Sequence, residues 1–493
     1  MKALFMTMAL AAATLAGQVM AATPAAVASA PLASAAHKFD AATVERGRYL
    51  AVASDCMACH TAHHGKPMAG GLVMSSPVGE IVSTNITPSK QYGIGNYSEQ
   101  QFSDAVRRGV RADGQMLYPA MPYTAYARMT DDDVRAMYAY FMQAVPAVEQ
   151  RTQATSLPFP MNIRQSMKAW NALFLDTQPL PAAPERSAQW LRGRYLAEGA
   201  AHCTTCHTPR GTFMQEDMSR HLSGAQVGPW YAPNITSHPT AGIGSWSEAE
   251  LVQYLRTGRV EGKAQAAGSM AEAISLSFRH LDDNDLKAIA VYIKTVPPVV
   301  GAGDRADGAS RFNQGQAGNA LVNLRGTSYA DNLKGQYLGA QIYSANCASC
   351  HGASGQGTAD GYYPTLFHNS ATVNKSNLLA TVLLGVDRKT ADGHVFMPPF
   401  GAQVNAVNHL SDKEVAALAN YVLVQFGPGA AAADIQETDV ATVRQGGPQS
   451  HMLALARAGG VFALLVVVLL VWYVRRRRAA AAASAAAAAS TQA

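Results

Sequence analysis

A five-residue pattern, Cys-x-x-Cys-His, occurs three times in this chain of 493 residues and uses all six of its cysteines. The copies are Cys56-Met57-Ala58-Cys59-His60, Cys203-Thr204-Thr205-Cys206-His207 and Cys347-Ala348-Ser349-Cys350-His351. This pattern is the attachment signature of a c-type haem, in which two thiols form thioether bonds to the ring and the adjoining histidine supplies an axial iron ligand. The sequence therefore predicts three covalently bound haem c groups.

Cys-x-x-Cys pairs also occur in redox-active disulfides and in zinc sites. A zinc site needs four ligands brought together, whereas these pairs lie roughly 145 residues apart along the chain. A redox-active dithiol does not require a histidine directly after its second cysteine, and only 14 residues of the chain are histidine. The histidine beside all three pairs favours haem attachment.

The spacing of the motifs divides the chain into three modules. This number agrees with the typical domain size of about 150 residues. We place module one at residues 39–148, module two at 186–300 and module three at 331–428. Each module opens with a similar segment, at residues 46–51, 192–197 and 335–339. Each ends in an amphipathic helix with a capping residue at its start. A helix before the haem motif and another at the end of a small domain predict a mainly α fold of three consecutive class I cytochrome c-like domains.

Two further segments repeat in modules one and two. Thr84-Asn85-Ile86-Thr87-Pro88 matches Pro233-Asn234-Ile235-Thr236, and residues 93–95 match 242–244. Module three has residues 362–366 in their place. The repeated asparagines either bond a haem carboxylate or support their own turn. Arg107, Arg108 and Arg256 either pair with haem propionates or lie on solvated helix faces. His63 and His64 are expected to be exposed loop residues.

An electron-transfer haem usually has both axial positions filled, and a methionine opposite the histidine raises its potential. In module three, Met397 is the only methionine between His351 and Met452. It is followed by proline, as Met121 is in module one. We therefore predict that Met397 is the sixth ligand of the third haem.

For the first haem we predict Met121, with Met116 and Met129 as competitors. For the second we predict Met270, which follows its histidine at nearly the same distance along the chain as Met121 does. The alternative is that methionines at these positions only fill the core.

The remaining segments connect or anchor the modules. Residues 1–21 have the pattern of a signal peptide, and residues 453–474 that of a membrane-spanning helix. Four arginines follow that helix, which places the modules outside and the tail inside by the positive-inside rule. The expected connecting segments are a mobile leader at 22–38, a linker at 149–185 that packs across modules one and two or against a partner, a loop at 301–330, a linker at 429–452 and a cytoplasmic tail at 475–493.

Composition and motifs exclude several classes of function. The formal charge of +5 is too small to indicate nucleic-acid binding. No nucleophile–base pair, P-loop or dinucleotide fingerprint occurs, so the chain is not expected to carry substrate chemistry of its own. Two other functions remain possible for a three-haem protein, namely a peroxidase or reductase with one haem open to a ligand, and an electron donor to a terminal oxidase.

The chain resembles the triheme cytochrome c subunits of bacterial membrane-bound dehydrogenases, of the quinoprotein alcohol dehydrogenase and flavoprotein gluconate or sugar-alcohol dehydrogenase type. The resemblance is carried by the three haem motifs, the repeated segments, and residues 117–123, 170–174 and 420–422. It implies a separate quinoprotein or flavoprotein catalytic subunit at the periplasmic face of the inner membrane, with electrons passing to ubiquinone. It also implies that Met121, Met270 and Met397 are axial ligands.

Overall fold

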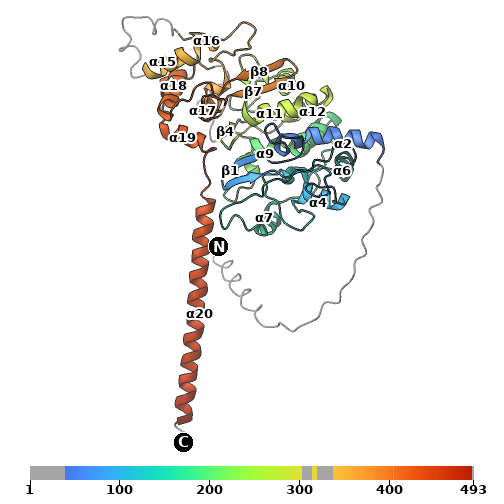
Figure 1. Cartoon of the computed structure of the whole chain (residues 1–493), viewed down its shortest axis with the longest axis vertical. Helices are drawn as coiled ribbons and strands as arrows, with labels where there is room; N and C mark the ends of the chain where they lie inside the picture. Colours follow the sequence, from blue (N-terminus) through green and yellow to red (C-terminus); the bar gives the residue numbers. More distant parts are fainter. Residues whose placement is uncertain (1–38, 302–311, 313, 319–336, 404, 491–493) are drawn as a thin grey trace. The chain divides into compact units, whose positions relative to one another are not determined.

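The computed structural model describes residues 39–301, 312, 314–318, 337–403 and 405–490, with side chains as far as residue 482. The expected signal peptide and leader lie outside the described residues, as does most of the expected loop at 301–330. Within the described part, the structure is mainly helical, and each β-sheet there is a two-stranded antiparallel hairpin (Figure 1).

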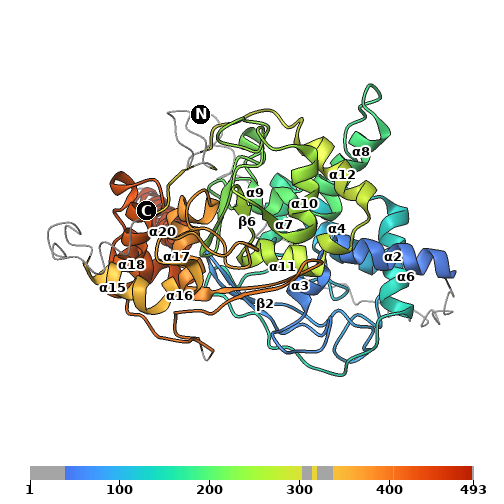
Figure 2. The ribbon, with the colours of Figure 1, turned by 90° about the horizontal axis from the view of Figure 1, so that it is seen from above.

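Module one begins and ends with helices that cross. Asp40 caps α2 (Ala41–Ala53) by accepting a hydrogen bond from the Thr43 N–H, and Thr130 caps α6 (Asp131–Gln143) in the same way. The two helices pack against each other, as Figure 2 shows. In the sequence, the elements between these two helices are α3 (Cys56–His60), β1 (Val73–Ser76), β2 (Gly79–Val82), α4 (Glu99–Arg108) and α5 (Tyr123–Tyr126).

Module two repeats this order with additions, whereas module three places a helix between its haem motif and its hairpin. Module two contains α8 (Ala188–Tyr195), the π-helix η1 (Leu196–Ala200), α9 (Cys203–His207), β3 (Ala225–Val227), β4 (Trp230–Ala232), α10 (Glu248–Thr257), β5 (Arg259–Val260), β6 (Ala264–Gln265), α11 (Gly268–Leu276) and α12 (Asp283–Ile293). Module three contains α15 (Tyr337–Asn346), α16 (Ala348–His351), α17 (Lys375–Leu384), β7 (Val386–Thr390), β8 (Gly393–Met397) and α18 (Asp412–Gln425). Short 3-10 turns occur at Met218–Arg220, Phe278–His280, Ser370–Thr372 and Ala430–Ala432.

A glycine allows the two terminal helices of each module to cross closely. A Cβ added at Gly47 would lie 1.8 Å from the carbonyl oxygen of Ala136 on α6. The equivalent distance is 1.8 Å from Gly193 to Ala288 and 2.3 Å from Gly339 to Ala417. Gly47 and Gly193 occupy the same place in the repeated opening segment, whereas Gly339 occupies the place of Ala51 and Ala197, about one helical turn later.

Modules one and two share a hydrophobic core, whereas module three has its own. One cluster of buried side chains runs from Leu50 and Phe141 in module one to Leu196 and Ile289 in module two. A second cluster surrounds α15, α17 and α18. Because apolar burial is the main favourable term in folding, modules one and two are expected to stabilise each other.

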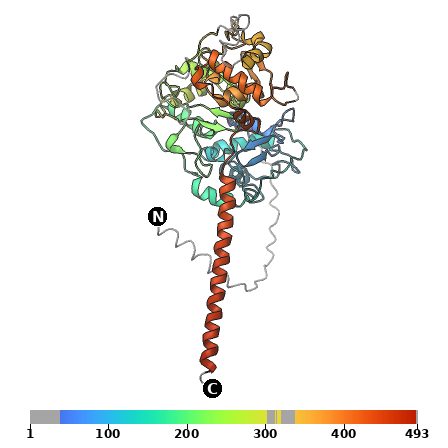
Figure 3. The ribbon, with the colours of Figure 1, turned by 90° about the vertical axis from the view of Figure 1, so that its left-hand side faces the viewer.

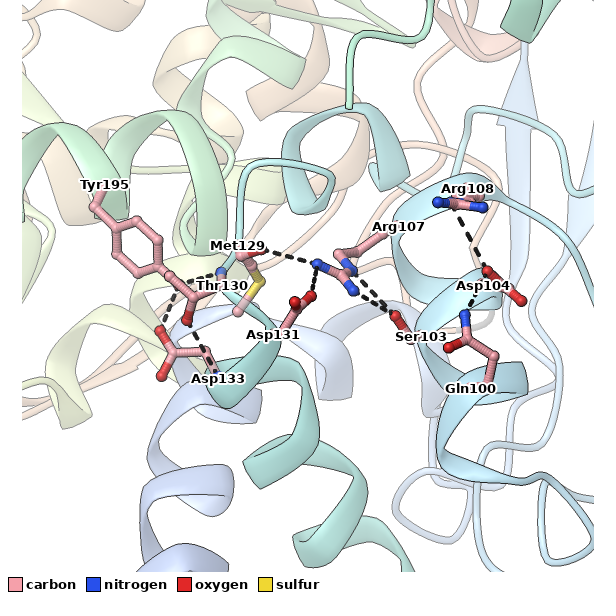
Figure 4. Close-up of polar contacts among 10 residues, drawn as sticks. All are labelled: Gln100, Ser103, Asp104, Arg107, Arg108, Met129, Thr130, Asp131, Asp133 and Tyr195. Carbon is pink, nitrogen blue, oxygen red and sulfur yellow. Dashed lines mark hydrogen bonds and ion pairs between the residues drawn. The ribbon is translucent and has the colours of Figure 1, made fainter. Parts of the chain in front are cut away.

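Modules one and two also exchange matching polar contacts. Tyr49 Oη donates to Asp285 Oδ2 at 2.7 Å and accepts from the N–H of Asp282 at 3.3 Å. Tyr195 makes the same two contacts in the other direction, donating to Asp133 and accepting from the N–H of Thr130 at 3.2 Å (Figure 4). Each tyrosine therefore binds the first turn of the closing helix of the other module.

The segment expected to be a linker at 149–185 packs across modules one and two. It contains α7 (Ser166–Phe174), where Asn171 Oδ1 accepts from Tyr123 Oη of module one at 2.9 Å. On the same helix, Trp170 Nε1 donates to the carbonyl of Phe213 in module two at 2.8 Å. The segment therefore contacts both modules, which is the first of the two arrangements expected for it.

The segment after module three is more ordered than the sequence indicated. We expected a loose linker at 429–452, but it contains α19 (Glu437–Arg444), in which Val440 and Val443 are buried. Nearby, Asn420 of α18 holds Ile435 through hydrogen bonds to both its N–H and its carbonyl. The first part of the expected linker therefore belongs to the core of module three.

The C-terminal helix α20 (Met452–Ser490) is one long continuous helix, as Figure 3 shows. Residues Met452–Ala482 include a window with mean hydropathy 2.5, and none of that window is buried against the protein. The helix continues beyond residue 474, through the four arginines expected to begin the cytoplasmic tail. Its length and composition suit a membrane span.

Candidate haem sites

Each Cys-x-x-Cys-His motif forms a short helix. Side chains at positions i, i+3 and i+4 lie on one face of a helix, so both thiols and the imidazole face the same way. The residue before the first two motifs has a left-handed backbone, with φ of 52° at Asp55 and 38° at His202. In the third motif Cys347 itself is the N-cap of α16.

Four of the six cysteines lack the lowered thiol pKa of a redox dithiol. All six are free of disulfide bonds. Burial raises the pKa of the thiols of Cys56, Cys59, Cys203 and Cys347 to about 12. A redox-active dithiol needs a lowered pKa, because the thiolate is the nucleophile. The described residues also contain no group of three or more His, Cys, Asp or Glu side chains suited to chelating a metal ion directly.

A backbone carbonyl holds the histidine of every motif. The Nδ1 contacts are His60 with the Thr84 oxygen at 2.7 Å, His207 with the Pro233 oxygen at 2.6 Å and His351 with the Pro364 oxygen at 3.0 Å. A carbonyl only accepts, so Nδ1 carries the proton and Nε2 is left to bind iron. Burial lowers the pKa of His60 and of His351, which favours the neutral, metal-binding form.

The sequence did not reveal these carbonyls, although it contained a signal for them. Thr84 and Pro233 occupy matching places in the repeated segments, directly before Asn85 and Asn234. Pro364 lies in the segment that module three has instead. The segment at 362–366 therefore supplies the carbonyl that binds the motif histidine in module three, as the repeated segments do in the other two modules.

Asn85 and Asn234 stabilise these segments. Asn85 Oδ1 accepts from the N–H and the hydroxyl of Thr87, at 2.9 and 2.7 Å, while its Nδ2 donates to the carbonyl of Val148 at 2.8 Å. Asn234 makes the matching contacts with Thr236 and Val299. Of the two interpretations, the turn role is confirmed. Each asparagine also binds the irregular segment that follows the closing helix of its module.

The arginines considered as propionate partners bind within their own modules instead. Arg107 pairs with Asp131 at 2.6 Å and also donates to Ser103 and the carbonyl of Met129 (Figure 4). Arg256 repeats this arrangement with Asp283 at 2.5 Å and the carbonyl of Arg279. The remaining candidates, Arg108, His63 and His64, are exposed surface residues. Arg108 lies 3.8 Å from Asp104 on its own helix.

The first two motifs line one cavity of about 2410 Å³. Met121 and Met270 line it as well, together with His60 and His207. The competitors Met116 and Met129 are not among its lining residues and are almost fully buried in the protein. Met214 also faces the cavity, from a position shortly after His207. Other methionines, Met214 among them, also line this cavity, so the ligand role of Met121 and Met270 stays a prediction.

In module three, Met397 ends β8 and packs, like Cys347, against the core of that module. Each motif thus offers two thiols and an imidazole with Nε2 free for a metal, and each module contains a candidate methionine. This donor set fits a haem c with histidine and methionine as axial ligands. A haem so bound carries one electron at a time between its ferric and ferrous states.

Comparison with known proteins matches the sequence to the cytochrome c family at residues 44–144, 191–297 and 337–425. The chain is 44% identical over 444 residues to the fructose dehydrogenase cytochrome subunit of Gluconobacter japonicus, covering 88% of each chain. It is 38% identical over 422 residues to the alcohol dehydrogenase (quinone) cytochrome c subunit of Gluconobacter oxydans, covering 82% of this chain and 84% of the relative.

It is also 38% identical over 421 residues to the gluconate 2-dehydrogenase cytochrome c subunit of Pantoea cypripedii, covering 82% of this chain and 90% of the relative. The predicted fold class is confirmed by the three family matches. The three motifs within those matches imply three haem c groups. The chain therefore belongs to the family of three-domain cytochrome c electron-transfer subunits of dehydrogenase complexes.

Proposed function

We propose that this chain carries electrons from the catalytic subunit of a dehydrogenase complex, a quinoprotein or a flavoprotein, to ubiquinone in the inner membrane. The observation that carries the proposal is the threefold haem site. Each motif presents two thiols and a histidine with a fixed tautomer, in a chain similar over most of its length to the cytochrome subunits of fructose, alcohol and gluconate dehydrogenases.

In this proposal each iron has a histidine and a methionine ligand. The pairs are His60 with Met121, His207 with Met270 and His351 with Met397. The lining of the shared cavity supports the first two pairs, and the position of Met397 beside the core that Cys347 also contacts supports the third. With both axial positions filled, no iron is left open for a substrate, which favours an electron carrier over a peroxidase or reductase.

We further propose that α20 anchors the chain in the inner membrane with the haem modules on the periplasmic side. An exposed apolar helix supports membrane attachment, and the four arginines after it support this orientation. The apolar start at residues 1–21 is the pattern of a signal peptide and supports export.

The experiment is purification of the tagged chain from detergent-solubilised membranes. We expect a large subunit carrying flavin or a quinone cofactor to copurify, and the complex to reduce ubiquinone with fructose, gluconate or a simple alcohol. A chain that contains three haems but brings down no such subunit and reduces no quinone with any of these substrates would contradict the proposal.

A further inference from the structure

A buried arginine reaches from module three into module two. Arg388 on β7 is only 2% exposed, and its guanidinium donates to the carbonyl oxygen of Ala266 at 2.6 Å and to Gln265 Oε1 at 3.0 Å. Both acceptors are uncharged, and its Nε has no hydrogen-bond partner among the described residues. Asp392 attracts the guanidinium electrostatically, but it forms no direct ion pair with Arg388 in the described part of the chain. A buried charge that is bound directly only by neutral acceptors is costly, so an arginine held this way calls for a functional explanation.

The residues that Arg388 binds lead directly to a proposed haem ligand. Gln265 ends β6, and Ala266 lies four residues before Met270 on α11. The strand that carries Arg388 packs along α11, and the N–H of Lys389 donates to Ser275 Oγ on that helix at 3.2 Å. Module three therefore contacts the residues just before α11 and Ser275 near the end of α11, so that its contacts lie on either side of Met270 in the sequence.

The same hairpin carries the proposed methionine of the third haem. β7 pairs with β8 in antiparallel register, with Val386 opposite Met397 and Arg388 opposite Val395. The elements β7, β8 and α11 are labelled in Figure 1. One two-stranded hairpin thus connects the methionine side of the second haem site with that of the third.

Module three also holds the histidine side of the second site. Asn377 on α17 accepts from the N–H of Tyr231 at 2.9 Å and donates to the carbonyl of Tyr231 at 3.0 Å. Tyr231 lies on β4, two residues before Pro233, whose carbonyl binds His207 Nδ1. Both axial sides of the second site are therefore in contact with module three.

The space around Arg388 is fitted to its side chain. Gly258 has φ of +73°, and a Cβ added there would lie 2.6 Å from Cδ of Arg388. Any larger residue at position 258 would have to displace the arginine. The glycine and the two acceptors leave the guanidinium one well-defined position.

We propose that Arg388 is a positioning residue that keeps Met270 on the iron of the second haem by fixing the start of α11 to module three. This inference rests on the proposed role of Met270 as axial ligand. It makes the docking of module three part of the second haem site, and it joins the methionine sides of the second and third sites through a single hairpin.

The test uses Arg388→Met in the full-length chain within its complex, with three haems per chain verified first. We expect the midpoint potential of the second haem to fall and the reduced protein to bind one equivalent of carbon monoxide per chain. Arg388→Lys keeps the charge, but its side chain is shorter and lacks the planar fork of a guanidinium, so it should hold the two acceptors less well and show a smaller effect of the same sign. Unchanged potentials and no carbon monoxide binding in folded Arg388→Met would overturn the inference.

Three further variants make the outcome specific. Met270→Ala identifies the potential of the second haem, and a Met270→Ala protein without any change would contradict the ligand proposal itself rather than the role of Arg388. Tyr195→Phe removes a contact between modules one and two and should leave the second haem unchanged. If Arg388→Met does not fold, Gln265→Ala removes one acceptor only and should still lower the same potential, whereas no change in Gln265→Ala would overturn the inference.

Discussion

At the scale of single residues, the histidine and methionine sides of each haem site are held by different means. A backbone carbonyl fixes each histidine, and that carbonyl belongs to a segment stabilised by its own turn. Of the proposed methionine ligands, Met270 lies on α11 and Met397 ends β8, whereas Met121 lies in the loop just before α5. Replacing a methionine should therefore change the iron without disturbing the histidine.

Met397→Ala should open the third haem to external ligands and lower its potential, because the thioether sulfur favours the reduced iron. We expect a decrease on the order of 0.1 V, a fraction of the roughly 0.8 V range that axial ligands span. Spectroelectrochemical titration with and without carbon monoxide measures both effects. Met116→Ala, which removes a buried core methionine, is the control and should leave all potentials in place. A Met397→Ala protein with an unchanged third potential would remove Met397 from the axial role.

Asp285→Asn should destabilise the chain by about 2 kcal/mol near neutral pH, because it removes a charged acceptor for Arg192 and Tyr49. Burial raises the pKa of Asp285, but the hydrogen bonds from these two residues outweigh it and lower the pKa below its usual value. A lowered pKa means that the stabilisation is complete above about pH 4 and is lost as the pH falls through the folded-state value.

The measurement is the thermal midpoint of wild type and Asp285→Asn between pH 7 and pH 3. The gap between the two proteins should close in acid. A gap that stays constant or widens as the pH falls would contradict the assignment of the charged form to the folded state.

Sequence reasoning found the residues whose chemistry is local. The six cysteines and three histidines are adjacent in the chain, so the pattern alone identifies them. The partners of Tyr49 and Arg388 were not found, because each lies more than a hundred residues away and depends on how the modules meet. A buried arginine has no signature in a single sequence.

At the scale of elements, the fold depends on the crossing of the first and last helix in each module. Close contact at Gly47, Gly193 and Gly339 brings the helices together. The capping residues and apolar spacing predicted these helices well. The hairpins β1–β2 and β7–β8, and the helix α19, were missed, because such short elements carry weak local signals and form only against the rest of a module.

Gly193→Ala should destabilise the chain, although the same change on an exposed helix surface would stabilise it by about 1 kcal/mol. The added Cβ would lie 1.8 Å from the carbonyl oxygen of Ala288, and a backbone atom cannot move aside like a flexible side chain. We expect a loss of about 1–3 kcal/mol, as for other overpacked cores. Gly459→Ala on α20, where an added Cβ meets nothing within 4 Å, is the matched control. Denaturant unfolding measures the free energy of unfolding of both variants. Equal values for the two variants would contradict the close helix crossing at Gly193.

At the scale of the whole molecule, modules one and two share a core, and module three contacts module two through Arg388 and Asn377. The three-module organisation was readable from the sequence, because every module repeats the same motif. How modules two and three join was not, since module three has diverged in the segments that face its neighbour.

A chain that ends at residue 457, which keeps Met452, Leu455 and Ala456 in the lining of the haem cavity, should leave the membrane and keep all three haems. The window of α20 that could span a membrane has none of its residues buried against the modules, so its removal costs them little packing. Fractionation of cells that express the shortened chain, followed by haem staining, measures the change. The membranes are first washed with salt, without detergent, to release the shortened chain from any catalytic subunit. If the shortened chain then stays in the membrane fraction, α20 is not the anchor.

The most direct test of an electron path through three haems is rapid mixing of the purified complex with its substrate under anaerobic conditions, followed by ubiquinone. We predict that substrate reduces three haem c per chain and that ubiquinone then reoxidises all of them. Haems that stay oxidised in the presence of substrate while the catalytic subunit turns over, or reduced haems that ubiquinone leaves unchanged, would contradict the proposed path.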